Sequence, residues 1–118
     1  MGKPVVHWEI WSAEHEKLGG FYQKLFDWQI EFNAFPNYGL TNTGGDGGIN
    51  GGFMKPQPGP IPKNQVTFYV KVEDLQATLD KAKGLCAELV LPPTPIPGVG
   101  SMALFKDPDG NVMGLWSQ

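Results

Sequence analysis

The segment VVHWEIW at residues 5–11 places side chains that could do chemistry at alternate positions. It is rich in β-branched and aromatic residues, which is typical of a β-strand. Because side chains alternate between the two faces of a strand, His7, Glu9 and Trp11 share one face. An imidazole near a carboxylate predicts a general acid–base pair or a polar anchor for a ligand. The alternative is a histidine whose hydrogen bonds are satisfied by Glu9 or Thr67.

A second strand-like segment, QVTFYVKV at residues 65–72, repeats this alternation. Its polar face carries Thr67, Tyr69 and Lys71. Tyr69 could stack on a flat ligand, and Lys71 could meet an anionic group. The alternatives are a core aromatic residue and a solvated lysine.

Two glycine-containing segments, DGGINGGF and DGNVMGLW, read alike. Each runs Asp-Gly, a turn residue, a β-branched residue, a second glycine and an aromatic residue. The glycines either allow a bend in a strand or open space for a ligand beside the backbone. The alignment pairs Gly51 with Gly114, and Phe53 with Trp116.

The whole pattern of one strand, one helix and three strands is expected twice along the chain. Between the copies lies KPQPGPIPKN at residues 55–64, whose four prolines exclude a helix or a central strand. We interpret this as an internal duplication within a single domain, with module one at 1–54 and module two at 65–118. The predicted fold class is α+β. Two tandem βαβββ modules form a curved, open, barrel-like sheet with helices outside and a cleft between the modules.

Several local features are expected to support this arrangement. Ser12 is a candidate N-cap for the first helix, and two glycines within that helix suggest close packing on the sheet. The second helix is expected within residues 73–86, with Cys86 buried in its apolar pattern. Prolines and glycines predict a loop over residues 94–100.

Composition narrows the classes of partner. The 118 residues carry a net charge of −3 without a basic block, which argues against a nucleic-acid backbone as partner. No apolar run is long enough to cross a membrane, and no signal peptide is seen. With one cysteine, the chain cannot form an internal disulfide, so we expect a cytoplasmic protein.

Three segments together resemble the glyoxalase/bleomycin-resistance/dioxygenase superfamily, also called the vicinal oxygen chelate superfamily. They are VVHWEIWSAEHEKLGGFYQKLFDW, VTFYVKVEDLQATLDKAKGL and FKDPDGNVMGLW, and the resemblance covers nearly the whole chain. It implies the fold described above, frequent dimers, and a divalent metal. The metal ligands in the family come from the first and last strand of each module.

At those four positions the resemblance points to His7, Thr67, Gly51 and Gly114. Metal-binding members commonly have histidine or glutamate where threonine and glycine stand here. Since metal sites of this kind usually use at least three protein ligands, we expect no metal cofactor. If a metal were present, His7 would be its ligand.

We therefore predict a protein that binds a small organic molecule in the cleft without a metal, as drug-sequestering members do. One alternative is a metal-dependent glyoxalase-like lyase or isomerase, or a dioxygenase. The other is a metal-free enzyme that uses His7 and Glu9 as catalytic residues. A homodimer is expected in each case. The predicted ligand-binding residues are Trp11, Gly51, Phe53, Thr67, Tyr69, Lys71, Gly114 and Trp116.

Overall fold

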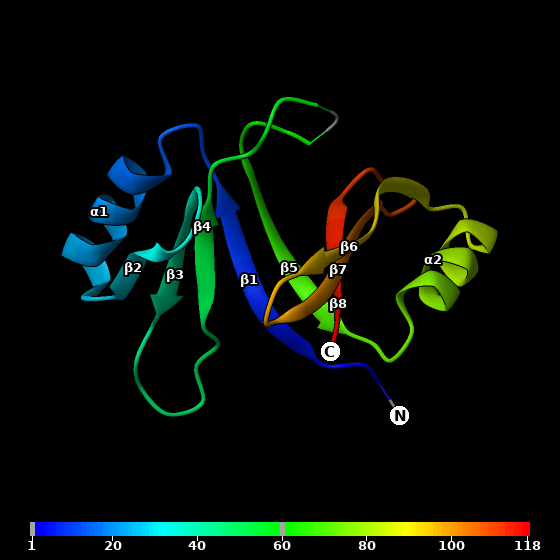
Figure 1. Ribbon diagram of the computed structural model, residues 1–118, viewed down its shortest axis with the longest axis horizontal. Helices are drawn as coiled ribbons and strands as arrows, with labels where there is room; N and C mark the ends of the chain where they lie inside the picture. Colours follow the sequence, from blue (N-terminus) through cyan, green and yellow to red (C-terminus); the bar gives the residue numbers. More distant parts are fainter. Residues whose placement is uncertain (1, 60) are drawn as a thin grey trace. The chain divides into compact units, whose positions relative to one another are not determined.

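Strands and helices follow the predicted order in both halves of the computed structural model, which describes residues 2–59 and 61–118 (Figure 1). The first half contains β1 (Val5–Trp11), α1 (His15–Phe26), β2 (Gln29–Phe35), β3 (Tyr38–Asn42) and β4 (Gly51–Met54). The second half contains β5 (Gln65–Lys71), α2 (Leu75–Gly84), β6 (Glu88–Ile96), β7 (Gly100–Lys106) and β8 (Val112–Ser117). Each half is thus a βαβββ module, and the α+β fold class is confirmed.

The proline-rich segment at 55–64 contains no helix or strand among its described residues, while Pro60 lies outside them. The chain divides into two compact units, one formed by His7–Val66 and one by Thr67–Gln118 with the residues up to Val6. The start of the chain therefore packs with the second module. There the Lys71 amide donates a hydrogen bond to the Pro4 carbonyl oxygen at 2.9 Å.

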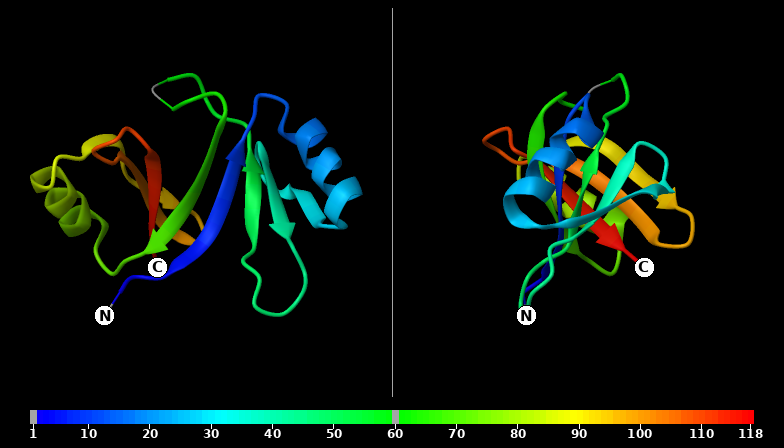
Figure 2. Two further views of the ribbon diagram at one scale, coloured as in Figure 1. Left: turned by 180° about the vertical axis from the view of Figure 1, so that it is seen from behind. Right: turned by 90° about the vertical axis from the view of Figure 1, so that its left-hand side faces the viewer.

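The first unit has the strand order β2-β3-β4-β1, with β4 parallel to β1 and the other pairs antiparallel. Figure 2 shows α1 along one face of this unit's strands. Aromatic rings fill the space beneath the helix, where Tyr22 stacks on Trp28 and contacts Phe53. Gly19 lets the helix approach closely, because a Cβ there would lie 2.9 Å from the Phe32 ring.

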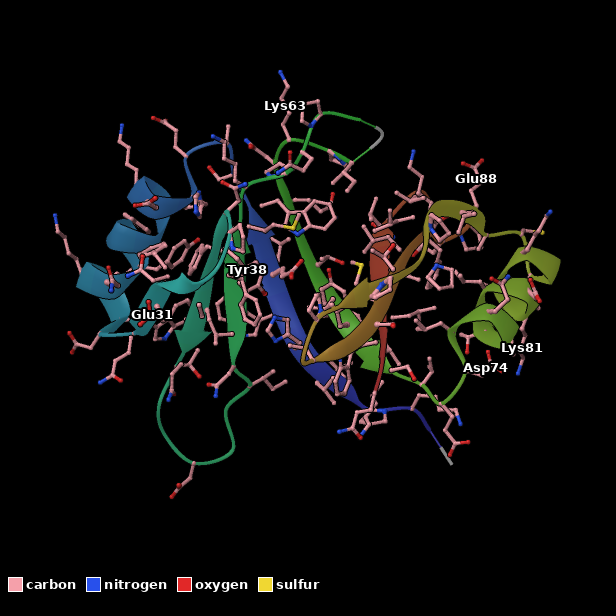
Figure 3. All side chains as sticks on the ribbon, in the orientation of Figure 1. Glu31, Tyr38, Lys63, Asp74, Lys81 and Glu88 are labelled. Carbon is pink, nitrogen blue, oxygen red and sulfur yellow. The ribbon has the colours of Figure 1, made fainter. Side chains whose placement is uncertain are left out.

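The second unit has the order β5-β8-β7-β6 and carries α2 on one face. Leu75 and Leu79 of the helix pack on Ala103 and Leu115 of the sheet. The helix begins at an N-cap, Asp74, whose carboxylate accepts a hydrogen bond from the Ala77 amide at 3.0 Å. Figure 3 labels Asp74 at this end of α2.

Three local predictions need correction. Ser12 does not cap α1, which begins at His15; the Ser12 hydroxyl instead accepts a hydrogen bond from the Glu14 amide. The predicted loop at 94–100 belongs largely to the β6–β7 hairpin. Strand β6 lies at an edge of its sheet order, where proline's missing N–H is tolerated.

Cys86 is exposed rather than buried. It follows the C-cap of α2 with a φ of 77°, so the chain has already left the helix at this residue. On α1, three large apolar side chains remain more than half exposed. These are Phe21, Leu25 and Phe26. No helix among the described residues is long and apolar enough to span a membrane.

Candidate functional site

A hydrogen-bonded network of four side chains lies on the face of the first unit opposite α1. The His7 Nε2 atom is 2.6 Å from the Tyr38 hydroxyl, which donates to Glu9 Oε2 at 2.9 Å. The Trp11 indole N–H donates to the other oxygen, Glu9 Oε1, at 2.8 Å. The three predicted residues of β1 thus lie on one face as expected, and Tyr38 joins them from β3.

Local sequence explains why Tyr38 projects onto this face. Pro36 and Asn37 form the two-residue connection between β2 and β3, and Asn37 has a φ of 56°, a value that asparagine tolerates. Tyr38 is the first residue of β3 and pairs with Met54 of β4. Figure 3 labels Tyr38 beside the strands of this unit. The sequence contained these turn signals, but not the strand pairing that brings Tyr38 to His7.

The network holds a carboxylate away from water. Glu9 is 6% exposed and Trp11 is 1% exposed. A buried carboxylate is costly unless it accepts hydrogen bonds, and here each oxygen accepts one. Trp11, one of the predicted ligand-binding residues, donates its indole N–H to Glu9.

Burial also acts on His7. Desolvation lowers the pKa of its imidazole below the ordinary value of 6.5, because the charged form loses hydration. A neutral imidazole has one nitrogen that donates and one that accepts. His7 is therefore suited to accept a proton or a hydrogen bond at neutral pH.

The position of Gly51 differs from the prediction. In the parallel pairing of β1 with β4, Trp8 lies opposite Gly51 and Glu9 lies opposite Gly52. A Cβ on Gly51 would meet the Trp8 ring at 2.2 Å, and that ring belongs to the aromatic core beneath α1. Gly52, not Gly51, shares the face of Glu9 and corresponds to Gly114. The predicted alignment of the last strands is wrong by one residue.

The same one-residue shift changes the face of the sheet on which Phe53 lies. Its side chain is fully buried and contacts Trp8 and Tyr22 on the helix side of the sheet. The structure therefore places Phe53 in the core of the first unit, away from the network. His15, at the start of α1, is also buried on the helix side, with its ring edge-on to Phe32.

Tyrosine rings cover the two glycines that correspond to each other. A Cβ on Gly52 would lie 2.2 Å from Cζ and Oη of Tyr38. In the second unit, a Cβ on Gly114 would lie 2.4 Å from the ring of Tyr69. These glycines do not leave the backbone bare, as a widened pocket would require; each allows a tyrosine ring to pack directly on the strand.

The second unit brings its predicted site residues together on the face opposite α2. Tyr69 lies beside Gly114, and Lys71 beside Trp116, in the parallel pairing of β5 with β8. The Lys71 ammonium is 5.6 Å from the centre of the Trp116 ring, within the range of a cation–π contact. Thr67 is buried, and its hydroxyl donates to the Val112 carbonyl oxygen at 2.6 Å.

The donors at these positions do not fit the divalent-metal site that the resemblance implies. Gly52 and Gly114 offer no side-chain ligand, and the Thr67 hydroxyl is hydrogen-bonded to its own unit. Both oxygens of Glu9 accept hydrogen bonds within the network. In the part of the chain that the structure describes, no three His, Cys, Asp or Glu side chains are grouped as metal ligands would be.

The model of the Glyoxalase/Bleomycin resistance protein/Dioxygenase superfamily matches residues 5–115, and the chain belongs to this superfamily. The resemblance seen in the sequence is thereby confirmed. Two curated relatives, from Mycobacterium bovis and Mycobacterium tuberculosis, share the name "Putative glyoxylase CFP32". Each is 27% identical over 115 residues, which cover 92% of this chain and 43% of the relative. The chain thus spans less than half the length of these relatives.

Solved structures agree on the fold. A superfamily member from Vibrio splendidus 12B01 matches with a TM-score of 0.66 and 13% identity, covering 99% of this chain and 100% of that chain. Methylmalonyl-CoA epimerase from Mycobacterium tuberculosis matches with a TM-score of 0.64 and 16% identity, covering 96% and 86%. At these identities the similarity establishes the shared fold alone.

Proposed function

We propose that the chain binds a small organic molecule, without a metal ion, on the sheet face that carries His7. The observation that carries this proposal is the partly buried network of His7, Tyr38, Glu9 and Trp11. Burying an imidazole and a carboxylate costs free energy that an apolar face would not. Titratable side chains that are partly buried, hydrogen-bonded to one another and shifted in pKa are candidates for a functional site.

The surroundings of the network support an organic ligand. Superfamily membership supplies a fold that hosts small-molecule sites, and the face opposite α1 carries an aromatic ring beside polar groups. The donor set described above supports a site that works without a metal.

A thermal-shift screen of small aromatic and carbonyl compounds tests the proposal. A compound present at 100 times its dissociation constant should stabilise the protein by about 2.7 kcal/mol. The shift should fall in His7→Ala and persist in His15→Gln, whose side chain lies on the helix side of the same sheet. A shift that is equal in both variants, or no shift from a broad library, would contradict the proposal.

A second candidate is a metal-free enzyme in which His7 moves a proton and Glu9 supports it. The observation that favours it is the continuous hydrogen-bonded path from the His7 ring through Tyr38 to Glu9. A bound carbonyl compound held in D2O should then exchange its α-hydrogen, as NMR would show. Binding without such exchange would favour the binding protein, whereas a metal requirement would favour the glyoxalase-like or dioxygenase alternative.

We also propose that the protein forms a homodimer in the cytoplasm. Support comes from the large apolar side chains that remain exposed, including Phe21 and Leu25 at 56% each. Light scattering after size exclusion should give twice the mass of the chain, and the melting temperature should rise with protein concentration. A concentration-independent monomer would contradict this part of the proposal.

A further inference from the structure

The first amides of α1 have no protein acceptor. The N-cap residue, Glu14, makes no side-chain cap hydrogen bond, and the first bond of the helix joins the Leu18 amide to the Glu14 carbonyl oxygen at 3.0 Å. Within the part of the chain that the structure describes, the amides of residues 15–17 donate to no other group. In α2 the Asp74 carboxylate accepts from such an amide. Free amides at the start of a helix carry partial positive charge and favour an oxyanion.

A groove of about 280 Å³ lies at this end of α1, within the first unit. It is lined by residues 13–17, by Asn37 of the β2–β3 turn and by Lys55, which follows β4. The Lys55 amide donates to the Asn37 carbonyl oxygen at 2.9 Å, which fixes this wall of the groove. Figure 1 shows the start of α1 at the same end of the unit as the end of β4. The groove therefore provides space for a small ligand beside the helix start.

A buried imidazole without a hydrogen-bond partner also lines this groove. His15 is 8% exposed, and its ring packs edge-on against Phe32 without a hydrogen bond to any described residue. Trp116 Nε1 is the one side-chain nitrogen or oxygen, among the described residues, that is both fully buried and without a partner. The His15 ring nitrogens are therefore not sealed from solvent, and the ring reaches solvent where it lines the groove. An imidazole N–H at this place can donate a hydrogen bond to a ligand.

The charged side chains around the groove balance one another. Lys17 and Lys55 line it together with Glu14 and Glu16. The two ammonium groups favour an anion, and the two carboxylates oppose it. The start of the helix adds roughly half of a positive charge, so the amides and the imidazole decide the sign of the ligand.

We propose that the N-terminal end of α1 binds a small oxyanion, of which inorganic phosphate is the simplest example. The donors are the amides of residues 15–17, the His15 ring, and the ammonium groups of Lys17 and Lys55. The site is separate from the His7 network, which lies on the opposite face of the sheet from α1. Its ligand and its test are therefore independent of the function proposed for that network.

NMR titration of 15N-labelled protein with sodium phosphate, at constant ionic strength and neutral pH, measures binding at individual amides. The resonances of residues 15–17 should shift and saturate. A parallel titration with sodium acetate shows whether the site also accepts a carboxylate. Lys55→Gln should weaken phosphate binding about threefold. Lys24→Gln is the matched control, because it removes the same charge in the last turn of α1 and should leave the binding unchanged.

Two histidine variants separate this site from the network. His15→Phe keeps a ring packed on Phe32 but removes both nitrogens, so it should weaken phosphate binding. His7→Ala should leave phosphate binding unchanged, because that side chain lies on the other face of the sheet. Loss of phosphate binding in His7→Ala, with retention in His15→Phe, would assign the anion to the network and overturn the inference.

Glu14→Asp introduces a competitor of unchanged charge. It places at the start of α1 the residue type that caps α2, and the shorter carboxylate should accept from the amides that the anion would use. The melting temperature of the free protein should rise, and phosphate should bind more weakly. A higher melting temperature with unchanged phosphate binding would overturn the inference. So would unsaturated shifts of residues 15–17 with both anions, or equal losses in Lys24→Gln and Lys55→Gln.

Discussion

At position 52 a single methyl group should disturb the network. In Gly52→Ala the new Cβ would overlap the end of the Tyr38 ring, which must move and leave Glu9 with one fewer donor. Losing a partner of a buried charged group costs about 1–3 kcal/mol, which chemical denaturation can measure. Gly20→Ala is the control, because it faces open space in α1 and should stabilise by up to about 1 kcal/mol. Equal effects of both variants would contradict the proposed packing.

The half-buried imidazole of His7 predicts a dependence of stability on pH. Its pKa in the folded state lies below the ordinary 6.5 because of desolvation, so the unfolded chain binds more protons between the two values. The His7 contribution to stability is therefore complete above about pH 6.5 and is lost as the pH falls below it. Melting temperatures between pH 7.5 and 5 should show a shallower decline in His7→Gln than in the wild type. Parallel curves would contradict the assignment.

At the scale of elements, the two helices differ in whether the side chain of the N-cap residue makes a capping hydrogen bond. Asp74 caps α2 through the Ala77 amide, whereas Glu14 at the start of α1 makes no side-chain cap hydrogen bond. Asp74→Ala should therefore cost about 1 kcal/mol of stability, and Glu14→Ala should cost less. Denaturant titration of both variants measures the difference. A loss in Asp74→Ala that is no larger than the loss in Glu14→Ala would contradict the stabilising role of the Asp74 cap.

Elements with strong local patterns were predictable from sequence. The alternation of VVHWEIW gave β1 with its bounds, and the matching halves gave the βαβββ order. The prolines and glycines of residues 94–100 predict a loop, because sequence alone does not show that β6 lies at an edge of its sheet order. Cys86 was misplaced because the helical pattern continues beyond the residue at which the helix ends.

The candidate site was only partly predictable, because it depends on pairing between distant strands. His7, Glu9 and Trp11 share a face through alternation alone. Tyr38 is 31 residues from His7 and reaches it only through the register of β3, β4 and β1. The same register decides between Gly51 and Gly52, since a shift of one residue moves a side chain to the other face.

At the scale of the whole molecule, the donor chemistry predicts that stability does not depend on a divalent metal. Protein purified without chelators should contain far less than one Ni, Zn, Mn or Fe ion per chain by elemental analysis. Its melting temperature should be the same with EDTA and with each added metal salt, because a ligand that binds only the folded state would raise it. His7→Ala should show the same insensitivity. A stoichiometric metal whose removal lowers the melting temperature of the wild type, but not of His7→Ala, would instead favour the glyoxalase-like alternative.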